Sequence, residues 1–273
     1  MISYKLNETL LKIEDVSLSY DGRPILKKVN AEIKNITRPG CITGQIVGFL
    51  GPSGIGKTQL FRIIAGLNQP TTGRVSINGW DKPVVAGEIG VVAQNYPLLE
   101  HRTVFSNLMV AAKQVEKDAK VAKEKVLAFL QDFDLVDKRN LYPAQLSGGQ
   151  RQRCAIIQQV LCSEHFLLLD EPFSGLDLLI LEKTCALLQK VANLNDLNTI
   201  IVVTHDVTAA ASISDHIWLI GRDSDANGIK LPGAKIVKEF NLIERNLCYQ
   251  PGIATSAILM DFVREVKEDF RYL

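Results

Sequence analysis

The first part of the chain alternates apolar and polar residues, a pattern that predicts β-strands. Over residues 10–20 the apolar positions are Leu11, Ile13, Val16, Leu18 and Tyr20. Asp21-Gly22 then interrupts the pattern with residues that favour a hairpin turn, and a second strand is expected at Ile25–Ile33. Asn35–Gly44 contains proline and glycine and is expected to be a loop. The N-terminal part is therefore predicted to be antiparallel β structure.

A continuous apolar run at Gln45–Leu50 is typical of a strand that is buried on both faces. Helical spacing follows at Thr58–Ala65, where Gly66 can end the helix. Further strands are expected at Val75–Ile77 and Glu88–Ala93. This order of strand, helix and strand indicates an α/β core.

From about Val104 to Leu161 the spacing becomes helical and few strand signals remain. Within this region Lys113–Lys125 is dense in lysine and glutamate, which favours a solvated helix face over a binding patch. Strand and helix signals then return in the order strand, helix, strand and strand-with-turn, at residues 166–169, 178–193, 199–203 and 217–238. The second half of the chain therefore continues the α/β pattern.

An amphipathic helix is expected near the end of the chain, after Pro251-Gly252. Its apolar positions recur at spacings of three and four residues, at Ile258, Leu259, Phe262, Val263, Val266 and Phe270. Packing of this face on the helix's own domain is favoured, and docking to a partner is the alternative.

Composition limits the classes of function only weakly. The 273 residues hold 31 basic and 30 acidic side chains, so the overall charge gives no reason to expect a nucleic-acid partner. No segment has the ~18 consecutive apolar residues of a membrane span, and the beginning of the chain lacks the pattern of a secretion signal. The five cysteines include no Cys-x-x-Cys pair. We therefore expect reduced thiols and a cytoplasmic protein.

The clearest chemical motif is Gly51-Pro52-Ser53-Gly54-Ile55-Gly56-Lys57-Thr58, which we call the phosphate loop. It lies between the predicted strand at 45–50 and the predicted helix at 58–65, as a phosphate-binding loop requires. Its glycines allow backbone N–H groups to approach phosphate oxygens, and the N-terminus of the helix adds positive potential. Lys57 is expected to bind the β- and γ-phosphates, and the Thr58 hydroxyl is expected to bind Mg²⁺.

Two adjacent acids, Asp170 and Glu171, follow the apolar strand at Phe166–Leu169. Ligands of open α/β sheets bind beyond the carboxyl ends of the strands, so both acids are expected to face the nucleotide. Asp170 is expected to hold Mg²⁺, and Glu171 to orient or deprotonate the attacking water. Acids often end strands for structural reasons alone, and it is the phosphate loop upstream that favours the catalytic interpretation.

Between these motifs lies Leu146-Ser147-Gly148-Gly149-Gln150, and with it the chain closely resembles the ATP-binding subunits of ABC transporters over about residues 11–240. We call Ser147–Gln150 the signature segment. Its hydroxyl and its free N–H groups precede a predicted helix, so it can hold phosphate by itself. In the family this segment acts across a dimer, on ATP held by the partner's phosphate loop.

The resemblance assigns further residues. Tyr20 matches the aromatic residue that stacks on adenine, and Gln94 matches the glutamine that touches Mg²⁺ and the attacking water. The residues after Gln94 resemble the segment that meets the membrane subunit. Asp177, in Ser174-Gly175-Leu176-Asp177, matches the loop that contacts the opposing subunit, and His205 matches the histidine that binds the γ-phosphate.

Three features depart from the family pattern. Gln59, counted with the ATP-binding residues, stands where Thr or Ser is usual, so contacts to the α-phosphate can differ. Asn35–Gly44 is longer than the usual connection, and Gln158 replaces a common arginine. None of these changes removes a catalytic group.

The resemblance implies an α/β fold with a P-loop NTPase (RecA-like) core, an N-terminal antiparallel β subdomain and an inserted helical subdomain at about 97–164. We expect the cassette to span residues 1–240, and an extension with the amphipathic helix to span 241–273. The implied function is Mg²⁺-dependent ATP hydrolysis by a dimer, formed with a second copy or a paralogue. This dimer would drive transmembrane permease subunits from the cytoplasmic face of the inner membrane.

Import is favoured, with a substrate-binding protein as a further partner, and export of lipid or metal is the alternative. The segment Asn241–Phe270 loosely resembles subunits for nitrate, sulfonate or taurine uptake. A soluble cassette ATPase acting in translation or on DNA is the main rival; the single cassette and the absence of a sustained heptad run count against it. The signature segment disfavours a P-loop kinase.

Overall fold

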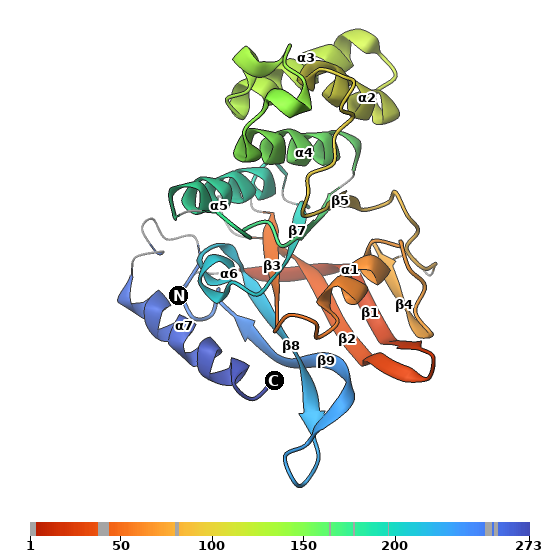
Figure 1. Cartoon of the computed structure of the whole chain (residues 1–273), viewed down its shortest axis with the longest axis vertical. Coiled ribbons are helices and arrows are strands. Elements are labelled where there is room, and N and C mark those ends of the chain that lie inside the picture. The colour runs from red at the N-terminus through yellow and green to blue at the C-terminus, as the bar shows by residue number, and fades with distance from the viewer. Residues whose placement is uncertain are drawn as a thin grey trace.

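The structure is a computed structural model. It describes residues 4–37, 44–79, 82–163, 165–176, 178–195, 197–248, 253 and 256–273. One nine-stranded sheet organises these residues, in the order β4-β1-β2-β9-β8-β3-β7-β6-β5 (Figure 1). The strands are β1 Lys5–Tyr20, β2 Arg23–Thr37, β3 Gln45–Leu50, β4 Thr72–Ile77, β5 Gly90–Val92, β6 Phe166–Asp170, β7 Thr199–Thr204, β8 His216–Ser224 and β9 Lys230–Asn241. The predicted α/β class is confirmed.

The N-terminal strands β1 and β2 form the predicted antiparallel hairpin, with both turn residues, Asp21 and Gly22, in the left-handed region. The loop predicted at residues 35–44 was placed to start too early. Strand β2 continues to Thr37, which pairs with Lys5 at the start of β1. Ile36 explains the difference, since its side chain is 2% exposed and packs in an apolar cluster. Residues 38–43 lie outside the described part of the chain.

The parallel half of the sheet places several strand ends at one edge. Strand β3 is buried along its whole length and lies between β7 and β8. Leu50 at the end of β3 is opposite Thr204 at the end of β7, and Asp170 at the end of β6 is opposite Val203. The carboxyl ends of β3, β7 and β6 are therefore level with one another.

Helices cover the sheet and form a separate group at one end of the molecule (Figure 1). Near the sheet lie α1 Lys57–Ile64, α5 Leu178–Ala192 and α6 Val207–Ile213, and the group at the end comprises α2 Val104–Val115, α3 Ala119–Asp132 and α4 Gly148–Cys162. Two 3₁₀ turns, Val136–Lys138 and Pro143–Gln145, connect α3 to α4. An apolar cluster joins α2, α3 and α4 to β5, β6 and β7.

The charged stretch Lys113–Lys125 is not one helix face, because the chain leaves the helical conformation at Glu116. Asp118 then accepts hydrogen bonds from the N–H groups of Lys120 and Val121 and starts α3. A carboxylate that caps free N–H groups stabilises a new helix start, and this local contact divides the stretch.

The amphipathic helix α7, Ala257–Phe270, packs on its own domain as predicted. Leu259, Phe262, Val263 and Val266 are buried in a cluster with residues of α6, β8 and β9. Ile258 is 63% exposed, so its place on the apolar face was predicted wrongly. Among the described residues, no helix combines the length and the apolar character needed to cross a bilayer.

Candidate functional site

The phosphate loop leaves the carboxyl end of β3 and leads directly into α1. A Cβ at Gly51 would lie 2.6 Å from the carbonyl oxygen of Ile220, so no larger residue fits there. Gly56 has a φ of +116°, which side chains rarely tolerate, and no side chain caps the helix that it starts. The first N–H groups of α1 therefore remain open to an anion. Ser53, Gly54 and Thr58 are exposed around this opening.

Lys57 lies beneath the loop rather than in solvent. It is 6% exposed, and its Nζ donates hydrogen bonds to the carbonyl oxygens of Gly51 at 2.8 Å and Pro52 at 3.1 Å. Burial lowers the pKa of Lys57, and the neighbouring carboxylates of Glu171 and Asp170 partly oppose this effect. A poorly hydrated ammonium group is thus held where a phosphate oxygen can replace a carbonyl partner.

Glu171 sits at the centre of the strand ends, in the left-handed region with a φ of 50°. Its N–H donates to the carbonyl oxygen of Val203 at 2.8 Å. Its carboxylate accepts a hydrogen bond from the Thr204 hydroxyl at 3.0 Å, and the Nδ1 of His205 lies 3.0 Å from both carboxylate oxygens. The Nζ of Lys57 is 3.9 Å away. The structure therefore brings the predicted residues Lys57, Glu171 and His205 together.

Asp170 presents a buried oxygen that is suited to a cation. Its Oδ1 is inaccessible and has no hydrogen-bond partner. Burial raises the pKa of Asp170, as does the charge of Glu171, while Lys57 and Arg62 oppose the shift. A carboxylate oxygen without a hydrogen-bond partner suits a Mg²⁺ ligand. Thr58, the second residue of α1, carries the hydroxyl that is expected to bind the same cation. In the described ranges, no group of three or more His, Cys, Asp or Glu side chains is placed to hold a metal ion by itself.

The buried carboxyl of Asp170 leads to a stability prediction. An acid whose pKa is raised by folding destabilises the folded state once the pH exceeds the pKa of the unfolded chain, about 3.9. Asp170→Asn should therefore raise Tm at pH 7, by about 2–4 °C if the relief is about 1 kcal/mol. The gain should shrink as the pH falls through the folded pKa, as thermal melts from pH 8 to pH 4.5 would reveal. Asp261→Asn, at an exposed position of α7, serves as the control; a lower Tm for Asp170→Asn at pH 7 contradicts the prediction.

Tyr20 is 47% exposed and its ring is fixed by its hydroxyl. The hydroxyl donates to the Gln59 side-chain oxygen at 3.0 Å and accepts from the Asn68 amide at 3.0 Å. Gln59 therefore orients Tyr20. This is the glutamine that stands where Thr or Ser is usual in the family. Sequence reasoning did not identify Asn68, because Asn68 is 48 positions from Tyr20 and no sequence pattern links the two residues.

Gln94 is exposed just beyond β5. Because Val92 pairs with Leu169, Gln94 emerges at the same sheet edge as Asp170. The residue Tyr96 and the buried Gln152 of α4 both donate to the carbonyl oxygen of Pro172, at 3.3 Å and 2.9 Å. Sequence reasoning missed this junction, which ties the segment after Gln94 and helix α4 to the residue next to Glu171.

The signature segment starts helix α4. The Ser147 hydroxyl accepts from the N–H of Gln150, and the Gln150 side-chain oxygen accepts from the N–H of Ser147 at 2.9 Å. Ser147 and Gly148 are exposed. Among the described residues, no hydrogen bond or ion pair joins the signature segment to the phosphate loop. Asp177 lies outside the described residues, so its predicted role stays a prediction.

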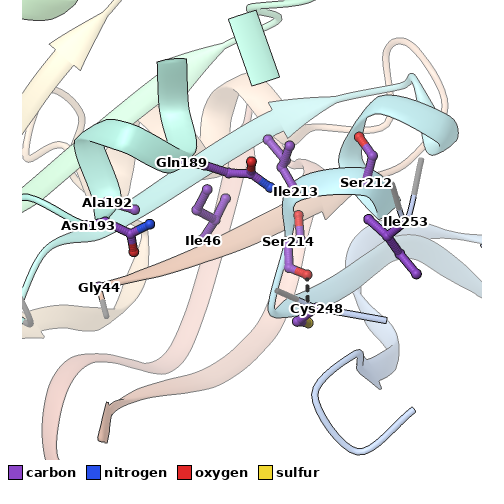
Figure 2. Close-up of a pocket in the computed structure, with 10 residues that line it drawn as sticks. All are labelled: Gly44, Ile46, Gln189, Ala192, Asn193, Ser212, Ile213, Ser214, Cys248 and Ile253. Carbon is purple, nitrogen blue, oxygen red and sulfur yellow. Dashed lines mark hydrogen bonds between the residues drawn. The ribbon is translucent and has the colours of Figure 1, made fainter. Parts of the chain in front are cut away.

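A cavity of about 290 Å³ lies at the opposite end of β3 from the phosphate loop. Figure 2 shows it between the ends of α5 and α6, with Gln189, Asn193 and Ile46 facing it and Cys248 at its border. The thiol of Cys248 donates to the carbonyl oxygen of Ser214. Among the described residues, no charged side chain lines the cavity. None of the predicted site residues contributes to it, so the candidate site is the open edge formed by loops and strand ends.

Comparisons with known proteins converge on one family. The family model described as ABC transporter matches residues 39–174. The chain is 34% identical to the spermidine/putrescine import ATP-binding protein of Spiroplasma citri, over 93% of this chain and 71% of that protein. It is 37% identical to the sulfate/thiosulfate import ATP-binding protein of a Synechocystis strain, over 75% of this chain and 56% of that longer protein.

Two solved structures share the fold. One is a dimer of an ATP-binding cassette in a post-hydrolysis state with ADP and phosphate, with a TM-score of 0.68, 28% identity and coverage of 85% of this chain and 99% of the other. The second is cbiO1 from Clostridium perfringens, part of the transporter complex cbiONQ, with a TM-score of 0.72, 24% identity and coverage of 88% and 91%. The arrangement of strands and loops described above is therefore that of these cassettes.

Proposed function

Because this chain belongs to the ABC transporter family as an ATP-binding and ATP-hydrolysing subunit, we propose that Lys57, Glu171 and His205 form its hydrolytic centre. The observation that carries the proposal is the position of the Glu171 carboxylate, within 3.0 Å of the His205 ring and 3.9 Å of the Lys57 ammonium. A carboxylate that is held beside a phosphate loop can accept a proton from water.

In the proposed mechanism, ATP places its phosphates on the phosphate loop, where N–H groups and the start of α1 attract them. Lys57 exchanges a loop carbonyl for oxygens of the β- and γ-phosphates and stabilises their charge. Glu171 takes the proton of the attacking water. Because Nδ1 of His205 faces the Glu171 carboxylate, Nε2 is the ring nitrogen that is left to donate a hydrogen bond to the γ-phosphate. Tyr20 stacks on adenine from its fixed position beside Gln59.

We assign the magnesium contacts to Thr58, Gln94 and Asp170. The unpaired Oδ1 of Asp170 supports this assignment, and so does the register that brings Gln94 to the same edge. Mg²⁺ neutralises charge on the β- and γ-phosphates when it is bound. Thr58, Gln94 and Asp170 would hold the cation directly or through its water shell.

The catalytic site becomes complete in a dimer. The signature segment exposes Ser147 and Gly148 at the start of α4, and no described contact joins it to its own phosphate loop. We propose that Ser147, Gly148, Gly149 and Gln150, together with Asp177, contact ATP held by a second subunit. That subunit is another copy or a paralogue.

The dimer is proposed to drive transmembrane permease subunits at the cytoplasmic face of the inner membrane. The relatives named above are import proteins, which supports import and a substrate-binding protein as a further partner. One relative serves polyamines and the other sulfate or thiosulfate, so we assign no cargo to this chain. Affinity purification of the full chain from membranes tests the assembly. Recovery of a membrane protein that raises the ATPase rate supports it, and recovery of ribosomes or DNA contradicts it.

A substitution in the signature segment tests the composite site. Ser147→Arg should leave the affinity of the isolated subunit for ATP within about twofold, because the Ser147 hydroxyl caps its own helix and no described hydrogen bond joins it to its own phosphate loop. Steady-state hydrolysis should fall at least ~100-fold, since the ATP bound to the second subunit loses its hydrogen bonds to the Ser147 hydroxyl and to the N–H groups at the start of α4. Ser256→Arg, at the start of α7, changes the same residue type at another helix start and serves as the control. Hydrolysis by Ser147→Arg at the wild-type rate would exclude the composite site.

A further inference from the structure

Thr204 has a buried hydroxyl that is hydrogen-bonded to the carboxylate of Glu171. It is the last residue of β7 and is 0% exposed. Its Oγ1 lies 3.0 Å from the Oε2 of Glu171 and 3.1 Å from the N–H nitrogen of Asp206. The main chain of Thr204 pairs with Leu50, directly before the phosphate loop. Thr204 thus connects the strand beneath the phosphate loop to the residue assigned as the base.

The direction of the hydrogen bond follows from the partners. The N–H of Asp206 can only donate, so Oγ1 uses a lone pair to accept it. An ionised carboxylate can only accept, so the single hydroxyl hydrogen of Thr204 is available to Glu171. Because the side chain is fully buried, water does not compete for this hydrogen. The bond is therefore directional and protected from solvent.

The Glu171 side chain needs such a contact, because several rotatable bonds separate its carboxylate from the backbone. Its other neighbours hold it less firmly: His205 has a side chain that is 53% exposed, and the Lys57 ammonium is 3.9 Å away and bonded to the loop carbonyls. Thr204 is branched at Cβ and lies within a paired strand, so its own rotamer has little freedom. A stiff donor then sets the position of a flexible acceptor.

We propose that Thr204 is a positioning residue that holds the Glu171 carboxylate in the orientation required to take a proton from water. The inference rests on the proposed role of Glu171. A misplaced base costs rate without loss of substrate affinity, because general-base catalysis depends on the distance between carboxylate and water. The effect of Thr204 is therefore expected in kcat, not in ATP binding.

The test compares Thr204→Val, which keeps the shape and removes the hydroxyl, with Thr204→Ser, which keeps the hydroxyl. In the full chain, Thr204→Val should lower kcat for ATP hydrolysis about 10- to 100-fold and leave the Kd for ATP within about twofold. Thr204→Ser should restore kcat to within about threefold of wild type. Thr199→Val is the matched control, since Thr199 is equally buried at the other end of β7 and its hydroxyl bonds only to the carbonyl oxygen of Leu197 among the described contacts. This control should keep the wild-type kcat.

A double variant separates positioning from a general structural role. In a Glu171→Gln background, Thr204→Val should change the residual rate less than about twofold, because no base remains to be positioned. If Thr204→Val lowers the rate equally in both backgrounds, Thr204 does not act through Glu171 and the inference is wrong. If Thr204→Val fails to fold, the same comparison uses Thr204→Ala and Thr204→Ser, and equal kcat values for these two overturn the inference.

The two proposals fail in different ways. Full activity of Glu171→Gln alone would remove the base from the proposed function, and with it any carboxylate for Thr204 to position. Loss of activity in Glu171→Gln together with a wild-type kcat in Thr204→Val would leave the proposed function standing and reject only the role of Thr204.

Discussion

Glu171→Gln should lower kcat for ATP hydrolysis about 10³-fold while the protein continues to bind ATP. The amide has nearly the same shape as the carboxylate and cannot take a proton, so the chemical step loses its base. The phosphate loop and Lys57 are unchanged, so the Kd for ATP should stay within about threefold. Single-turnover hydrolysis and equilibrium binding of a fluorescent ATP analogue measure the two quantities separately.

The same variant should accumulate as an ATP-bound dimer, because the proposed composite site forms around ATP and the variant hydrolyses that ATP too slowly to release the partner. Size-exclusion chromatography with light scattering, in ATP and Mg²⁺, reports the dimer. Glu182→Gln, at an exposed position of α5, is the control and should hydrolyse ATP normally. A monomeric Glu171→Gln protein under these conditions counts against the composite site between two subunits. Rapid hydrolysis by this variant counts against Glu171 as the base.

Lys57→Ala should weaken ATP binding at least ~100-fold. Lys57 is 6% exposed and its ammonium is bonded to loop carbonyls, so it can bind phosphate oxygens at a smaller desolvation cost than a surface lysine. Its loss removes charge-assisted hydrogen bonds to two phosphates. Isothermal titration with ATP and Mg²⁺ measures the change, and Lys123→Ala, at an exposed position of α3, is the control.

Thermal unfolding without nucleotide shows whether Lys57→Ala acts through misfolding. Burial lowers the pKa of Lys57, which means that the fold disfavours its charged form. Removing that charge should therefore leave Tm within about 2 °C of wild type or raise it. Unchanged ATP affinity in a folded Lys57→Ala protein would remove Lys57 from its assigned role.

The elements that the sequence predicted well are those whose signals are local. Strand β3 could be recognised because it is buried along its whole length between parallel strands, so that the five residues after Gln45 form an uninterrupted apolar run. The phosphate loop could be recognised because its chemistry needs glycines and a lysine at fixed spacing beside a strand and a helix. Helix α1 was predicted to within one residue at each end for the same reason.

Predictions failed where a distant contact decided the outcome. The loop expected from Asn35 is strand up to Thr37 because Lys5 and Leu6, some thirty residues earlier, provide the pairing edge. Ile258 has the spacing of an apolar helix face, yet the cluster under α7 leaves it in solvent. The spacing of apolar residues shows which of them share a helix face. Whether each residue on that face is buried depends on the residues that pack against it.

The sequence by itself determined the nucleotide chemistry of this protein. The roles proposed for Gly51–Thr58, Asp170 and Glu171 follow from residue type and order, because a polyphosphate and its metal require the same few kinds of atom around them. It also indicated the family, since Ser147–Gln150 stands between these motifs in a fixed order.

Only the tertiary structure decided how the catalytic groups support one another. Thr204 becomes a neighbour of the Glu171 carboxylate because β6 and β7 are adjacent parallel strands whose ends are level. Gln59 reaches Tyr20 because α1 packs beside the hairpin. These contacts cross 33 and 39 positions of the chain, and no local pattern encodes them. The sequence motifs identify the chemical groups of the site, and the order of the strands in the sheet determines which of these groups are in contact.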